Sequence, residues 1–153
     1  MDAVFGGGYV DAERLRALDF TQRVVLETLR LRSPVLFSRT AVEDVELGGV
    51  PIRHGTEIGI SPYALNLNPR VHPDPRRFDP GRASADAALP FGAGPHRCVG
   101  EIMALVEATT VLAVLTQHWI LKPVPGLRVR EHAGAQPHPG RLRLLAMPRN
   151  GTS

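Results

Sequence analysis

Two stretches of this chain carry hydrophobic residues at helical spacing, and a third alternates apolar with polar residues. Helix formers dominate residues 11–18 and 21–31, and Pro34 ends the second helix because the residue before a proline is disfavoured in the α region. Between residues 35 and 60, short alternating runs on either side of a Gly48-Gly49 turn predict a small antiparallel sheet.

A proline-rich loop and a long apolar helix follow this sheet. Ser61 and Pro62 supply an N-cap and a first helical residue, so a short helix is expected to reach about Leu67. Four prolines between residues 69 and 80 exclude regular structure there. Residues 100–118 predict the longest helix, apolar on most sides and therefore deeply buried. With strands expected in the tail, the predicted fold class is mainly α with small antiparallel β elements.

Composition mainly excludes classes of function. The chain of 153 residues can bury a core without disulfides or a structural metal. Its net charge of +3 comes almost wholly from arginines scattered among acids, which argues against nucleic acid as a partner. No apolar stretch is long enough to span a bilayer, and one cysteine forms no disulfide framework. We therefore expect a soluble cytoplasmic protein with no membrane partner.

The only cysteine, Cys98, lies in the stretch L-P-F-G-A-G-P-H-R-C-V-G-E, residues 89–101, directly ahead of the long helix. A helix N-terminus favours a thiolate through its free N–H groups and its dipole, and glycines let backbone approach a large flat group. Alternatively, a lone cysteine is a small buried hydrophobe. Zinc is disfavoured because no second ligand stands at metal spacing. A nucleophilic role needs a histidine at the sulfur, and His96 in this tight loop is poorly placed for it.

The stretch F-G-A-G-P-H-R-C-V-G, residues 91–100, resembles the haem-binding signature F-G-x-G-x-H-x-C-x-G of bacterial cytochrome P-450 haem-thiolate monooxygenases. The resemblance implies that Cys98 is the axial thiolate ligand of the iron of haem b, whose electron donation favours O–O cleavage. It also implies that Phe91 packs near the sulfur, that His96 faces a haem propionate and that Ala104 lies against the porphyrin. The haem-binding residues implied are Phe91, Gly92, Gly94, His96, Cys98, Gly100, Ala104 and Arg39.

A second family motif, E-x-x-R, is similar to Glu27 and Arg30 in V-V-L-E-T-L-R-L. Spacing of three residues places both side chains on one helix face, although most such pairs are solvated and contribute little. The segment H-P-D-P-R-R-F-D-P-G-R resembles the family's R-F-x-P-x-R, which implies Arg77 as the third member of a structural Glu-Arg-Arg triad. Arg76 is the rival for this place, and Arg82 is expected on a solvated surface.

The strand predicted after Pro34 supplies candidate pocket residues. Arg39 resembles the family's strand arginine that pairs with a haem propionate. Val35, Leu36 and Phe37 would then line the substrate pocket, or would simply form a core strand; the sequence favours neither. The segment 132–139 is expected to form another turn on the side of the pocket.

The resemblance covers only the C-terminal part of the family's fold, so residues 1–153 are expected to form a single partial domain. Nothing upstream of Glu27 resembles the family's oxygen-activation helix, with its acid–alcohol pair. The opening M-D-A-V-F-G-G is similar to the family's E-V-D-A-V-L-G-G loop, with Met1 in the place of a valine. We therefore hypothesise that the gene begins further upstream or was truncated here.

The function implied is monooxygenation of a small organic substrate by O2, with electrons from a ferredoxin or a flavoprotein reductase. One alternative is a non-catalytic haem-binding fragment, or one half of a split enzyme that needs a separate N-terminal chain. The other is a degenerate remnant without haem. For this remnant, an apolar helix at 100–118 without its neighbours would expose hydrophobic surface, which predicts self-association or aggregation.

Overall fold

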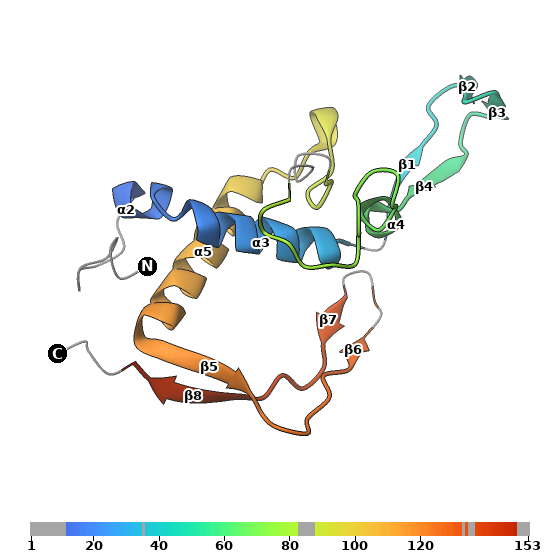
Figure 1. Cartoon of the computed structure of the whole chain (residues 1–153). Helices are drawn as coiled ribbons and strands as arrows, with labels where there is room; N and C mark the ends of the chain where they lie inside the picture. Colours follow the sequence, from blue (N-terminus) through green and yellow to red (C-terminus); the bar gives the residue numbers. More distant parts are fainter. Residues whose placement is uncertain (1–11, 35, 83–87, 133, 135–136, 150–153) are drawn as a thin grey trace.

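A computed structural model describes residues 12–34, 36–82, 88–132, 134 and 137–149 of the chain, and within them it has the mixture of elements predicted (Figure 1). The main helices are α2 (Ala12–Arg16), α3 (Asp19–Leu31) and α5 (Glu101–His118), with a short α4 (Pro62–Asn66). Four two-stranded antiparallel sheets complete the described part. No helix in these ranges combines the length and hydrophobicity needed to cross a membrane.

Local sequence explains the ends of the helices. α3 ends at Leu31, and the N–H of the next residue, Arg32, donates to the carbonyl of Thr28 at 2.9 Å. The hydroxyl of Ser61 accepts from the N–H of Ala64 at 3.1 Å, and Pro62 occupies the first position of α4. This N-cap satisfies a donor that the helix itself leaves unpaired, so the predicted short helix is confirmed.

The predicted sheet between residues 35 and 60 is two separate sheets. Strand β1 (Phe37–Thr40) pairs with β4 (Glu57–Ile60), and β2 (Val45–Leu47) pairs with β3 (Val50–Ile52) across the predicted glycine turn. Just beyond the β1–β4 ladder, the N–H of Ala41 donates to the carbonyl of Thr56 at 2.9 Å, and the carbonyl of Ala41 accepts from the N–H of Gly55 at 2.8 Å. The antiparallel pairing expected between residues 35 and 60 is therefore present, divided into two two-stranded sheets.

The tail forms strands, as expected. α5 passes directly into β5 (Trp119–Pro123), which pairs with β8 (Leu144–Pro148). Between them, β6 (Glu131–His132) pairs with β7 (His138–Pro139) in a small hairpin. Figure 1 shows this hairpin turned back toward the C-terminal end of α3.

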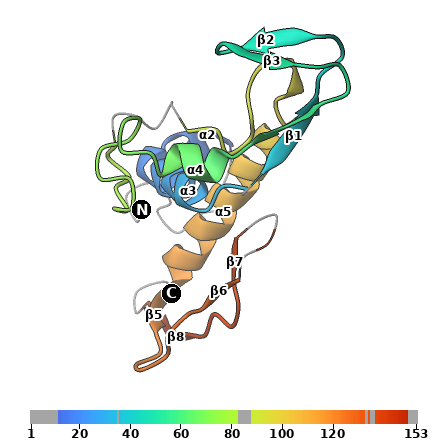
Figure 2. The same cartoon turned by 90° about the vertical axis from the view of Figure 1, so that its right-hand side faces the viewer.

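The apolar core is small and lies where α2 and α3 meet α5. Its buried members are Leu18 and Ala113, with Leu15 packed against them. Figure 2 shows α5 beside α3, with the β5–β8 ribbon at its far end. The prediction that α5 is deeply buried was wrong for this chain, because only Thr109, Ala113 and Gln117 are buried along it. The exposed apolar residues of this helix, which we call together the apolar side of α5, are Ile102, Met103, Val106, Val111, Val114 and Leu115.

Candidate functional site

The loop that carries the cysteine, residues 89–100, folds back on itself before α5 begins. The N–H of Cys98 donates to the carbonyl of Phe91 at 2.9 Å, which closes the loop. Gly92 and Gly94 have φ angles of +76° and +67°, a left-handed backbone that other residues rarely adopt. The short 3-10 turn η2 (Gly94–His96) follows them. The two glycines therefore allow the reversal that brings Cys98 back beside Phe91.

Cys98 is exposed and stands two residues before Gly100, the N-cap residue of α5. Its carbonyl accepts from the N–H of Glu101 at 3.3 Å, and the carbonyl of Gly100 accepts from the N–H of Ala104 at 2.9 Å. A Cβ on Gly100 would lie 3.9 Å from the sulfur, an ordinary contact, so the thiol itself does not require this glycine. The thiol thus lies at the positive end of the helix dipole.

A side-chain pair ties the loop to the first turn of α5. The guanidinium of Arg97 makes two hydrogen bonds to the carboxylate of Glu101, including one from Nη2 to Oε1 at 2.5 Å. These hydrogen bonds, with the attraction between the two charges, raise the pKa of Arg97 and lower the pKa of Glu101. Both groups are therefore charged at neutral pH, Arg97 directly before Cys98 and Glu101 at the first residue of α5.

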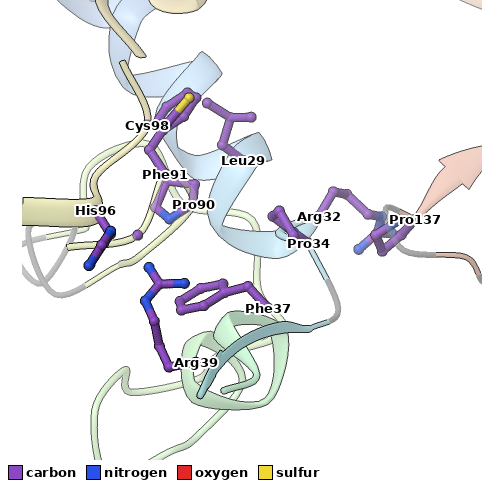
Figure 3. Close-up of a pocket in the computed structure, with 11 residues that line it drawn as sticks. Leu29, Arg32, Pro34, Phe37, Arg39, Pro90, Phe91, His96, Cys98 and Pro137 are labelled. Atoms are coloured by element: carbon purple, nitrogen blue, oxygen red, sulfur yellow. The ribbon is translucent and has the colours of Figure 1, made fainter. Parts of the chain in front are cut away.

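An open cavity of about 450 Å³ lies against this loop. Figure 3 shows that its walls come from the end of α3, from β1 and from the cysteine loop, with Pro137 of the β6–β7 hairpin at one edge. The site residues predicted from sequence that line it are Phe37, Arg39, Phe91, Gly92, His96 and Cys98. Its volume falls in the ordinary range of ligand pockets. The expected pocket-side turn at 132–139 is represented in this wall by Pro137.

Arg39 is held by its neighbours in β1. Its guanidinium lies 5.4 Å from the centre of the Phe37 ring, and Nη1 donates to the carbonyl of Ser38 at 2.8 Å. Figure 3 shows the guanidinium pointing toward His96. Leu36 instead lies over Gly59 and does not line this cavity, so the prediction for Leu36 is corrected. Val35 lies outside the described residues.

Glu27 and Arg30 form a buried ion pair on α3. The Arg30 Nε donates to Glu27 Oε2 at 2.7 Å and its Nη2 donates to Oε1 at 2.9 Å, with side chains only 1% and 3% exposed. Burial alone would raise the pKa of Glu27. The hydrogen bonds from Arg30 and from the N–H of Asp79, with the charges of Arg30 and Arg82, outweigh burial and hold that pKa below its ordinary value. The bidentate geometry makes this a strong pair, unlike a solvated one.

The third member of the triad is Arg82, and the prediction of Arg77 was wrong. Arg82 Nε lies 3.4 Å from Glu27 Oε1, and its side chain is 7% exposed. Arg77 is exposed and takes part through its backbone, since its carbonyl accepts from Arg82 Nη2 at 3.0 Å and from Arg30 Nη2 at 3.4 Å. The sequence did contain a signal for Arg82, because it is the last arginine of the segment R-F-D-P-G-R that resembles the family motif. We call Glu27, Arg30 and Arg82 the Glu27 clamp.

Polar residues that the sequence did not single out surround this clamp. Arg30 Nη1 donates to the carbonyl of Asn66 at 2.7 Å, and Asn66 Nδ2 donates to the hydroxyl of Ser33 at 2.6 Å. His72 is fully buried nearby; burial first, and then the charges of Arg30 and Arg82, lower its pKa. Asn66 Oδ1 also accepts from the N–H of Leu89, at the start of the cysteine loop, at 3.4 Å. The network therefore joins α3 and α4 to the loop that carries Cys98.

Comparison with protein families decides what this arrangement is. The family model described as Cytochrome P450 matches residues 1–139. The chain belongs to the cytochrome P450 family. Its fold is that of about a third of a P450 heme domain: the crystal structure of the cytochrome P450DA heme domain superposes with a TM-score of 0.86 at 26% identity, over 97% of this chain and 36% of that one. The predicted family and fold class are confirmed.

Two curated relatives come from Streptomyces. The chain is 39% identical to cyclooctat-9-en-7-ol 5-monooxygenase of Streptomyces melanosporofaciens, over 97% of its own length and 34% of the relative's. It is 35% identical to pentalenene oxygenase of Streptomyces avermitilis, over 94% and 34%. The chain therefore spans about a third of the length of these P450 relatives.

The described residues fit a haem group. The metal donors that line the cavity are the sulfur of Cys98 and the imidazole of His96, and no group of three or more histidine, cysteine or acidic side chains gathers around a metal position in the described ranges. Haem iron needs only one protein ligand on this side. A Cβ on Gly94 would meet nothing within 4 Å, so this part of the loop has open space beside it. Arg39 and His96 at the cavity suit the two carboxylates of haem.

Proposed function

We propose that this chain forms the haem-thiolate side of a cytochrome P450 monooxygenase that inserts one oxygen atom of O2 into a small organic substrate, with Cys98 as the iron ligand. The observation that supports this most is that Cys98, at the start of α5, lines one cavity with Arg39 and His96. In this proposal residues 1–153 form a single partial domain of a cytoplasmic protein. A ferredoxin or a flavoprotein reductase supplies the electrons.

Each residue of the site has a separate task in this proposal. Haem b, when bound, supplies the activation of dioxygen. Cys98 holds the iron, and the dipole of α5 favours its thiolate form. Arg39, fixed on the Phe37 ring, binds a propionate together with His96. The Glu27 clamp touches no reacting group and instead holds the segment that leads into the cysteine loop.

The substrate we propose is a small, largely apolar organic molecule. The apolar surface that Leu29, Pro34, Phe37 and Pro90 supply to the cavity suits the flat face of the haem, so the substrate class is proposed from the relatives. Two relatives are named for cyclooctat-9-en-7-ol and for pentalenene, which are molecules of this chemical class. Oxygenation of molecules of this class is therefore the activity to test first.

A specific observation favours a second candidate function. The chain spans about a third of its P450 relatives, and the apolar side of α5 is exposed. A haem-binding fragment without catalysis, or half of a split enzyme that needs a separate N-terminal chain, fits both facts. A remnant without haem is the third candidate, and it is separated from the others by haem binding alone.

Haem titration of the purified chain tests the ligand role. We expect the reduced CO complex to show the red-shifted Soret band of thiolate ligation, and we expect Cys98→Ala to lose that band. Val99→Ala is the matched control, because Val99 is the next residue and its side chain is fully exposed. The band should survive in this control. If the wild-type chain is folded and gives no such band, the proposal is contradicted. The remaining candidate is then the remnant without haem.

Turnover then separates an enzyme from a binder. The haem-loaded chain is given a ferredoxin, its reductase, NADPH and an apolar alkene or alcohol. Oxygen-dependent product from the chain alone supports the monooxygenase. Haem uptake without product, with product appearing only when a separately expressed N-terminal P450 segment is added, identifies the half enzyme.

A further inference from the structure

Helix α5 is covered along one side only. Thr109, Ala113 and Gln117 are its buried residues, and Ala113 shares a buried cluster with Leu18. Their spacing of four residues places these three side chains in one row, because an α-helix has 3.6 residues per turn. Figure 2 shows α2, α3 and α4 together on one side of α5. Within the described ranges, the other side of α5 therefore has no helix packed against it.

A second row of residues lies along this uncovered side: Glu107, Val111, Val114 and His118. The intervals of four, three and four residues place their side chains on one face of the helix. Val111 is 52% exposed, Val114 is 40% exposed, and both end residues are exposed. None of the ion pairs found among the described residues involves Glu107 or His118. We call these four residues the α5 row.

The order of residues in the α5 row is self-complementary. An acid stands at its N-terminal end and a histidine at its C-terminal end, with two valines between them. When two copies of α5 pack antiparallel, Glu107 of each copy faces His118 of the other, and Val111 of each faces Val114 of the other. Parallel packing would bring the two Glu107 carboxylates together, which is unfavourable. The antiparallel arrangement therefore gives every residue of the row a suitable partner.

The chemistry of these contacts suits a helix–helix interface. A neutral imidazole donates one N–H to a carboxylate, and a protonated one donates two and adds the attraction of opposite charges, so His118 pairs with Glu107 in either form. The valines in the middle lose contact with water when the second helix covers them. Apolar residues at the centre with charged pairs beside them also determine partner and orientation in coiled coils.

We propose that the α5 row is the interface of a symmetric, antiparallel dimer of this chain. The occupant of the uncovered side of α5 is then a second copy, chosen by the complementary ends of the row. An exposed apolar surface alone would associate without limit, whereas an interface in which the same surface contacts itself closes at two copies. This interface is independent of the function proposed above, because none of the four residues lines the cavity beside Cys98.

Sedimentation velocity of the full chain over a range of concentrations tests the dimer. We expect one reversible step from monomer to dimer, without larger species. Val111→Asp with Val114→Asp should abolish the dimer, because it places four carboxylates at the centre of the interface. Both side chains are exposed in the monomer, so circular dichroism should show an unchanged fold. Continuous growth into larger species, or a dimer that survives in this variant, overturns the proposal.

Charge reversal tests the antiparallel register. Glu107→Arg should weaken dimerisation about two- to thirty-fold, because both Glu107–His118 pairs are lost. Adding His118→Glu should restore the affinity, since each new arginine then faces a new glutamate. Glu46→Arg is the matched control: it makes the same change of charge at an exposed glutamate on β2 and should leave dimerisation unchanged. A double variant that dimerises no better than Glu107→Arg contradicts the register and with it the proposal.

A separately expressed N-terminal P450 segment is the competing occupant of this side of α5. If the purified chain is monomeric at every concentration tested and forms a one-to-one complex with that segment, the surface binds the segment and the dimer is wrong. If the dimer forms and the charge swap restores it, the proposal stands whatever the haem titration gives. A chain that dimerises in this way and takes up no haem would refute the proposed function alone.

Discussion

The Glu27 clamp and the apolar side of α5 invert the usual distribution of residues in a soluble domain. In the clamp, two arginines and a glutamate are almost completely buried and hydrogen-bonded. On α5, large apolar side chains are exposed, with Ile102 at 78% and Val111 at 52%. Buried charges are tolerated only when they are paired, and exposed apolar patches of this kind usually mark a surface that binds another one.

The difference shows which contacts this chain supplies for itself. The clamp finds its partners among Asp79, Asn66 and the loop carbonyls of Pro73, Asp74 and Arg77, all within the chain. The apolar side of α5 has no comparable cover in the described ranges. We therefore expect clamp substitutions to act on folding and substitutions on the apolar side to act on association.

The largest effect is expected at Arg30. Arg30→Met removes both hydrogen bonds to Glu27 and leaves a buried carboxylate without its main partner, which should lower the free energy of unfolding by about 3–5 kcal/mol. Urea unfolding followed by circular dichroism measures this. Arg23→Met is the control on the same helix, because Arg23 pairs with Asp19 at 3.1 Å on the surface and should cost only about 0.3–0.5 kcal/mol.

A variant that does not fold still leaves this prediction testable. Glu27→Gln added to Arg30→Met removes the uncompensated charge, so the double variant should be more stable than Arg30→Met alone. Equal stability of the double and the single variant would show that the buried charge is not the cause. If Arg30→Met lowers the free energy of unfolding no more than Arg23→Met does, the buried clamp contributes no more to stability than a surface ion pair.

The next effect distinguishes Arg82 from Arg77. Arg82→Met loses the contact with Glu27 and three hydrogen bonds to loop carbonyls, and should cost about 1–3 kcal/mol, less than Arg30→Met because Glu27 keeps its closer partner. Arg77→Met should change stability by less than about 0.5 kcal/mol, because that side chain is exposed. The same urea experiment measures both variants. A larger loss of stability in Arg77→Met than in Arg82→Met would mean that Arg77, as predicted from the sequence, is the third member of the clamp.

Local patterns predicted the parts of the site that depend on neighbours in sequence. The Glu27–Arg30 pair was expected from three-residue spacing on a helix together with the resemblance to a family motif, and the loop around Cys98 was expected from its resemblance to the haem-binding signature. The identity of Arg82 could not be derived this way. The proline-rich segment folds back so that Arg77 presents its carbonyl and Arg82 its guanidinium, and this depends on tertiary contacts.

Burial was the least predictable feature. Asn66 and His72 are buried polar residues without any local signal, because their surroundings come from α3 and from the proline-rich loop. α5 shows the opposite case: its composition predicts a buried helix, but burial also requires neighbouring surfaces. The sequence pattern thus predicts whether a segment forms a helix or a strand. How many faces of that element are buried depends on which other elements pack against it.

The smallest change in stability is expected on the apolar side of α5. Ile102→Gln with Val111→Gln should alter the free energy of unfolding by less than about 0.5 kcal/mol per site, because both side chains are exposed. The same variant should reduce self-association in sedimentation velocity, since it removes apolar surface. Ala113→Gln is the control on the same helix: Ala113 is fully buried against Leu18, so the larger side chain should cost about 1–3 kcal/mol. A comparable cost in Ile102→Gln with Val111→Gln would mean that this side of α5 is covered in solution.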